Sequence, residues 1–136
     1  MPTRASYDYA IIRVVPRVER EEFINVGVIL FCRTRRFLDA RIELDNKRLT
    51  ALAPDIDPSD VQQHLDLIPL ICKSKNKKDE IGQWTQAQRF HWLVAPRSAI
   101  IQTSVVHSGL CEDPAAALEG LMERMVRVPS VESGRD

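Results

Sequence analysis

Two stretches of the sequence carry polar side chains that could hold an anionic group. In the first, Arg13 lies in one strand-like run, and Asn25 and Gly27 interrupt a second run. If the two runs pair as a hairpin, Arg13, Asn25 and Glu22 lie near one end of a sheet, beside a glycine that lets a ligand approach closely. In the alternative interpretation, Glu22 pairs with an arginine, Asn25 satisfies a turn and Gly27 marks a β-bulge.

The second stretch is residues 89–98, which contains His91, Arg97 and Ser98. A planar guanidinium group with a hydroxyl group nearby suits the recognition of a phosphate or a carboxylate. The competing interpretation is that Pro96-Arg97-Ser98 is an ordinary turn between strands and that His91 occupies the solvent face of a strand. Both interpretations stay open at the level of sequence.

His107 is a further candidate, placed in a predicted loop before the last helix. With Glu22 it is one of two residues that could move a proton beside a bound anion. Pairing His107 with Ser98 or Ser104 would give a nucleophile and a base, but the chain has no GxSxG elbow and no evident oxyanion donor. We therefore assign no catalytic residue, and whether the protein is an enzyme stays open.

Motifs for metals and nucleotides are missing from the sequence. The three histidines have no metal-binding spacing, and there is no GxGxxG or Walker A motif, so we expect neither a metal site nor a cofactor. The cysteines are odd in number and form no CxxC pair, which favours buried thiols over disulfides or a thiolate zinc site. These cysteines are Cys32, Cys72 and Cys111.

Length and charge exclude several classes of protein. A chain of 136 residues with 44% hydrophobic residues is long enough for one core, and no apolar run approaches the ~20 residues needed to cross a bilayer. The 19 Lys+Arg balance 19 Asp+Glu, so a dominant nucleic-acid binder is not expected, although the sequence does not settle whether the lysine-rich loop over residues 73–78 contacts nucleic acid. The N-terminus does not read as a signal peptide, which predicts a cytoplasmic protein.

Strands come first along the chain. The residue types predict a three-stranded meander over residues 7–15, 23–32 and 38–44, with a turn at Arg35-Arg36 between the last two strands. Strict alternation in the second strand would place its core face on one set of residues, which are Ile24, Val26, Val28, Leu30 and Cys32. Residues 89–94 and 99–105 are predicted as two further strands.

Two helices are predicted from their start signals. Asp57-Pro58 and Asp113-Pro114 each combine an N-cap residue with a proline in the first turn. Pro69 is predicted to kink or stop the first helix. We therefore expect one α+β domain over residues 1–128, with an antiparallel sheet of about five strands covered on one face by the two main helices. Residues 129–136 are expected to form a flexible tail.

Short motifs spread over the chain from about Tyr7 to Val128 resemble a known family. They are Tyr7-Asp8-Tyr9, Arg13-Val14-Val15-Pro16, the run from Glu22 to Leu30, Phe90-His91-Trp92-Leu93, Ala95-Pro96-Arg97-Ser98, His107-Ser108-Gly109 and Asp113-Pro114. Together they resemble the bacterial domain-of-unknown-function 3037 family. The resemblance implies a protein partner, since members are often encoded beside a HipA-like kinase, but it supplies no catalytic residues.

Two hypotheses follow. The first is a non-catalytic accessory or binding partner of a HipA-like kinase. The second is a small enzyme or ligand-binding module that recognises a phosphate- or carboxylate-bearing ligand through Arg13, Arg97 and Ser98. The full set of candidate ligand-binding residues is Arg13, Glu22, Asn25, Gly27, His91, Arg97, Ser98 and His107. A shared cleft would favour the second hypothesis, and the sequence leaves the oligomeric state open.

Overall fold

The centre of the sheet is the predicted meander. In the computed structural model, which describes residues 3–74, 80–97 and 99–128, β1 (Ala5–Val14), β2 (Ile24–Cys32) and β3 (Phe37–Ile42) pair antiparallel in sequence order. A short 3-10 helix, η1 (Val18–Arg20), lies between β1 and β2. Arg36 turns the chain between β2 and β3 with a φ of 53°, which confirms the predicted turn.

Two short strands share the other side of β1. β4 (Ile101–Thr103) pairs with the C-terminal end of β1, and β5 (His107–Cys111) pairs with its N-terminal half. Between these two strands, Ser104 forms two hydrogen bonds with the backbone of β1. Its Oγ accepts from Ile11 N at 2.9 Å, and its own N donates to Ile11 O at 2.8 Å. The five-stranded antiparallel sheet is therefore confirmed, with β4 and β5 acting as one interrupted edge strand.

Two predictions about local structure are wrong. The strand predicted over residues 89–94 is instead the C-terminal part of helix α4 (Gln86–Leu93) with its C-cap Val94, and the helix begins with a capping box between Thr85 and Gln88. The segment starting at His107, predicted as a loop, is β5. It becomes a strand because the long β1 offers an unpaired side there, which is not visible in the local sequence.

The alternation predicted for β2 also fails. Arg13 pairs with Asn25 and Ile12 with Gly27, so Val26 is an extra residue in β2 and marks a bulge. Val26 lies in the core on one face of the sheet, whereas Val28 and Leu30 lie in the core on the other face. The bulge shifts the period by one residue and divides the predicted core set between both faces.

The remaining elements are helical. The predicted helices are α2 (Pro58–Lys73) and α5 (Pro114–Met125), and α1 (Asn46–Leu52) and α3 (Glu80–Gln83) were not anticipated. α2 does not stop at Pro69 but continues for another turn, because the burial of Cys72 keeps that turn on the sheet. None of the helices described here is long and apolar enough to cross a membrane.

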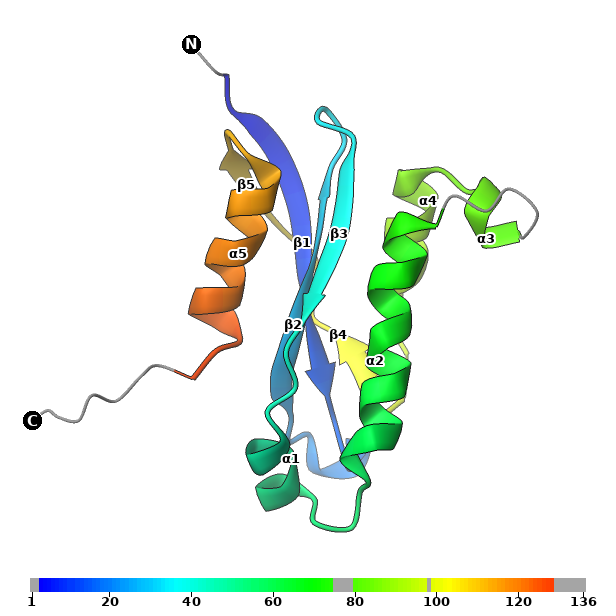
Figure 1. The fold of residues 1–136 in the computed structure, drawn as a ribbon, viewed down its shortest axis with the longest axis vertical. Coiled ribbons are helices and arrows are strands. Elements are labelled where there is room, and N and C mark those ends of the chain that lie inside the picture. Colours follow the sequence, from blue (N-terminus) through cyan, green and yellow to red (C-terminus); the bar gives the residue numbers. More distant parts are fainter. Residues whose placement is uncertain (1–2, 75–79, 98, 129–136) are drawn as a thin grey trace, which may run out of the picture.

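The helices cover both faces of the sheet, not one. α2 and α4 pack against one face and α5 packs against the opposite face, as Figure 1 shows. The reason is that β2 is buried on both sides, so each face needs a cover. All three cysteines are buried and free, as predicted. The predicted tail at 129–136 and most of the lysine-rich loop lie outside the described residues.

Candidate functional site

The structure brings Arg13 and Asn25 together. They are direct partners in the β1–β2 pairing, on the sheet face that α5 covers. Asn25 Nδ2 donates to the carbonyl oxygen of Met125 at the end of α5 (3.0 Å), and the Arg13 guanidinium lies 4.2 Å from the centre of the Phe23 ring. These two predicted residues therefore lie side by side.

Glu22 and Gly27 have structural roles. Glu22 is exposed and forms an ion pair with Arg20, with 2.6 Å between Oε1 and Nε, and this bond lowers the pKa of its carboxyl. Gly27 lies beside the bulge, where an added Cβ would come within 2.5 Å of the carbonyl oxygen of Arg41 on β3. The position therefore requires glycine because the neighbouring strand β3 approaches it closely.

The other predicted residues lie elsewhere. Arg97 is exposed, stacks over Trp92 at 4.5 Å and donates to its carbonyl oxygen at 2.6 Å. His91 is exposed on α4. His107 begins β5, with its ring 5.3 Å from that of Tyr9. Ser98 lies outside the described residues.

Arg13 and Arg97 therefore do not share a cleft. Arg13 lies on the face that α5 covers, whereas Arg97 is bound to the last residues of α4 on the opposite face. A joint site for the candidate residues is not assembled in the described part of the chain. Whether any of them binds a ligand stays a prediction.

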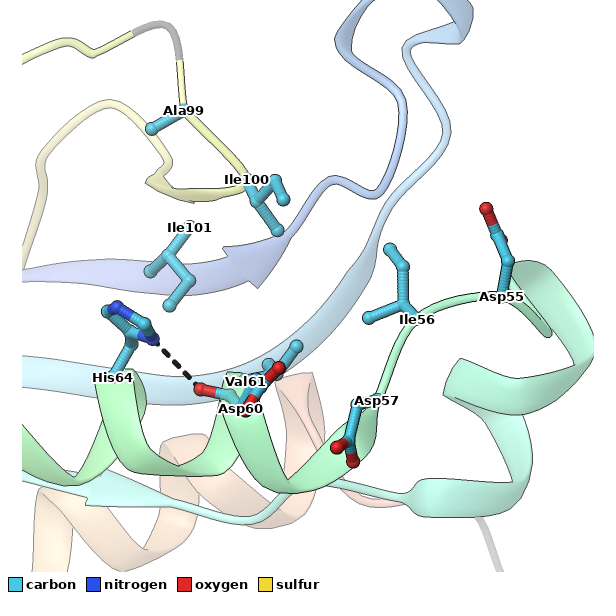
Figure 2. Close-up of a pocket in the computed structure, with 9 residues that line it drawn as sticks. All are labelled: Asp55, Ile56, Asp57, Asp60, Val61, His64, Ala99, Ile100 and Ile101. Carbon is cyan, nitrogen blue, oxygen red and sulfur yellow. Dashed lines mark hydrogen bonds between the residues drawn. The ribbon is translucent and has the colours of Figure 1, made fainter.

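A hollow that the sequence did not indicate lies between the start of α2 and the segment that enters β4 (Figure 2). Its volume is about 520 Å³, and we call it the α2 hollow. Its lining residues are Asp55, Ile56, Asp57, Asp60, Val61, His64, Ala99, Ile100 and Ile101. Figure 2 shows Ile100 and Ile101 facing Val61 and His64 across the gap. The two sides lie about forty residues apart in sequence and meet because β4 pairs with β1.

Most polar groups on the rim are already engaged. Asp57 caps α2 and accepts from Ser59 N at 2.9 Å, a hydrogen bond that lowers the pKa of the Asp57 carboxyl. Asp55 forms an ion pair with Arg17 at 3.5 Å. The His64 ring is fixed because its Nδ1 donates to the carbonyl oxygen of Asp60 at 2.8 Å. With these side chains committed, the α2 hollow offers mainly an apolar surface.

The strip next to the hollow also exposes apolar side chains. Val105, in the segment between β4 and β5, is 75% exposed, and Leu110 on β5 is 63% exposed. Ile100 and Val106 are also exposed. We call the set Ile100, Val105, Val106 and Leu110 the open edge. Apolar side chains gathered at an unpaired sheet edge are typical of an interaction surface.

Metal chemistry finds no support in the described residues, where no group of three or more His, Cys, Asp or Glu side chains is placed to hold an ion. Cys72 is buried, and burial raises the pKa of its thiol to about 12, so it is a poor nucleophile at neutral pH. Burial also raises the pKa of the Cys111 thiol. These thiols serve as core residues.

Comparison with known proteins gives one finding. No curated protein and no solved structure matches the chain. A family model described as "Protein of unknown function (DUF3037)" matches residues 9–126. That range covers most of the 136 residues and contains all five strands except the first four residues of β1. The chain therefore belongs to the DUF3037 family.

Proposed function

We propose that the protein is a non-catalytic binding module that docks a protein partner on the open edge and the adjoining α2 hollow. The observation that carries the proposal is the exposure of Val105, between β4 and β5, and of Leu110 on β5, at the edge of the sheet. Among the described residues no strand pairs with the outer side of β4 or β5. A partner there would gain both backbone hydrogen bonds and apolar burial.

The α2 hollow extends this surface. Ile100 belongs to both features, because it lines the hollow and is itself exposed. An apolar side chain of the partner would fit a hollow of about 520 Å³ and become shielded from water there. The two features together provide a pocket at one end of a strand edge, where Ile100 joins them.

A HipA-like kinase is the partner we propose. The choice of this partner is supported by the resemblance to the DUF3037 family, whose members are often encoded beside such a kinase. A docking role agrees with the rim of the α2 hollow, where the Asp57 carboxylate caps α2 and the Asp55 carboxylate pairs with Arg17.

Titration calorimetry with a purified HipA-like kinase from the same organism tests the proposal. The double variant Val105→Asp/Leu110→Asp should weaken binding at least about tenfold, because both apolar contacts are lost and charges are placed in the interface. The matched control is Leu67→Asp/Leu70→Asp, whose residues are 53% and 66% exposed on α2.

The control variant should bind as the wild type does. Thermal melts of both variants should stay close to wild type, since all four positions are exposed. Equal loss of binding in the two variants would contradict docking on the open edge. Failure of the wild type to bind the kinase would contradict the choice of partner.

A further inference from the structure

A second hollow lies on the other face of the sheet, near η1. Its volume is about 210 Å³, and its lining residues are Arg13, Val15, Val18, Glu21, Phe23 and Gln102. We call it the Arg13 hollow. It shares no residue with the α2 hollow or the open edge. The residues that line it are therefore distinct from those of the docking surface proposed above.

The guanidinium of Arg13 has no counter-ion among the described residues. Arg13 forms no ion pair there, and its Nε is buried without a hydrogen-bond acceptor. Arg41 and Arg127, by contrast, each pair with Glu119. Arg89 also has a buried Nε without an acceptor, but its Nη1 donates to the carbonyl oxygen of Ser74. Arg13 is half-buried and lines the hollow, so an oxyanion bound there would supply the counter-charge that the described residues do not.

The geometry leaves Arg13 free to bind in its own plane. Phe23 covers one face of the guanidinium at 4.2 Å. Stacking of this kind fixes the orientation of the planar group and leaves N–H donors at its rim available for two parallel hydrogen bonds to an oxyanion.

Gln102 adds a polar group to the same hollow. It is the direct partner of Arg13 in the β1–β4 pairing, and its Nε2 donates to the carbonyl oxygen of Ala99 at 2.7 Å. That bond fixes the amide group and leaves a second N–H for another acceptor. Arg13 and Gln102 thus present donors side by side on neighbouring strands.

Glu21 limits the charge that the hollow accepts. It is exposed at the end of η1, with a φ of 56°, and forms no ion pair among the described residues. A carboxylate in the lining repels an incoming anion, so replacing it with a neutral side chain should improve anion binding. This gives the inference a variant that predicts a gain.

We infer that the Arg13 hollow is a binding site for an oxyanion, held in the plane of the Arg13 guanidinium with help from Gln102. The ligand class is a small molecule or segment that carries a phosphate or a carboxylate group. Arg97 and Ser98 are not needed, which distinguishes this site from the joint site expected from the sequence.

Titration of the full chain by ¹⁵N NMR tests the inference, with inorganic phosphate and acetate as separate probes up to about 10 mM. We expect at least one probe to shift the Arg13 Nε–H and the Gln102 side-chain amide signals in a saturable way. Shifts with phosphate alone indicate a phosphate ligand, and shifts with acetate alone a carboxylate ligand. No saturable shift with either probe overturns the inference.

Variants locate the site. Arg13→Gln should weaken binding about tenfold or more, and Arg13→Lys should weaken it less because the charge remains without the fork. The matched control is Arg33→Gln, which removes an equal charge from an arginine stacked on Phe31. Glu21→Gln should tighten binding. Equal weakening in Arg13→Gln and Arg33→Gln would show general charge attraction and overturn the site.

Discussion

The two edges of the sheet differ in how they meet solvent. The β3 edge carries charged side chains that form ion pairs. Arg41 pairs with Glu119 at 2.7 Å, and Asp39 pairs with Lys73 at 3.6 Å. The opposite edge, formed by β4 and β5, exposes Val105 and Leu110. Charged side chains on an edge strand oppose pairing with another chain, whereas apolar ones favour it. The comparison indicates which side of the molecule is available to a partner.

The edges also differ in how tightly they are built. β3 is six residues long and pairs with β2 along its whole length. β4 and β5 are three and five residues long and are interrupted at Ser104. Short strands that share one interior neighbour are easier to displace than a long one. The open edge thus combines apolar exposure with the weaker half of the sheet.

Substitutions of two glycines, one beside each edge, should show the largest difference in stability between the β3 edge and the open edge. Gly27→Ala should destabilise the protein by about 3 kcal/mol, because the new Cβ would meet the Arg41 backbone at 2.5 Å and force β3 away. Gly109→Ala should cost only about 1 kcal/mol, since its Cβ would meet the outer end of the Tyr7 ring at 2.6 Å. Urea unfolding measures both, and equal losses would contradict the account.

Ser104 tests the join between β4 and β5. Ser104→Ala should cost about 2 kcal/mol of unfolding free energy, because the buried Ile11 N–H would lose its acceptor. Ser108→Ala is the matched control, since that exposed hydroxyl only bonds Asp8 at 2.8 Å and its loss should cost less than about 1 kcal/mol. A larger loss for Ser108→Ala would show that Ser104 does not hold the edge.

Acid should weaken the charged edge by a smaller amount. The hydrogen bond from Arg127 lowers the pKa of the Glu119 carboxyl below 4.5, so ionised Glu119 stabilises the fold at neutral pH. That contribution is lost as the pH falls through the lowered pKa, and the melting temperature should fall with it. The slope should be flatter in Glu119→Gln than in wild type.

The control for the acid experiment is Glu112→Gln. The Glu112 carboxylate forms no ion pair among the described residues, so its variant should keep the wild-type pH dependence. Added salt should reduce the wild-type slope, because these charges are exposed. If the melting temperature of Glu119→Gln depends on pH as that of the wild type does, the ionised Glu119 carboxylate does not stabilise the β3 edge.

The sequence predicted those parts of the fold that depend on neighbouring residues. Asp57 and Asp113 cap the helices that they were expected to start, and the meander follows from strand-like runs joined by short connections. It failed where two signals compete: residues 89–94 are apolar and aromatic enough for a strand, but Thr85 and Gln88 form the cap that starts a helix. The spacing of Thr85 and Gln88 is the sequence signal that predicts this helix start.

The surfaces proposed for binding could not be predicted, because they depend on contacts between distant residues. The bulge at Val26 decides which face each residue of β2 occupies, and only its pairing with β1 reveals it. The open edge exists because β4 and β5 pair with β1 rather than with each other. Only the neighbourhood of Arg13 and Asn25 was anticipated, since a hairpin is a local structure.

Hydrogen–deuterium exchange with and without a HipA-like kinase tests the central claim most directly. The account predicts that the kinase slows exchange in β4 and β5 and at the start of α2, while exchange in β3 stays unchanged. Slower exchange in β3, with β4 and β5 unaffected, would contradict the assignment of the open edge as the docking surface.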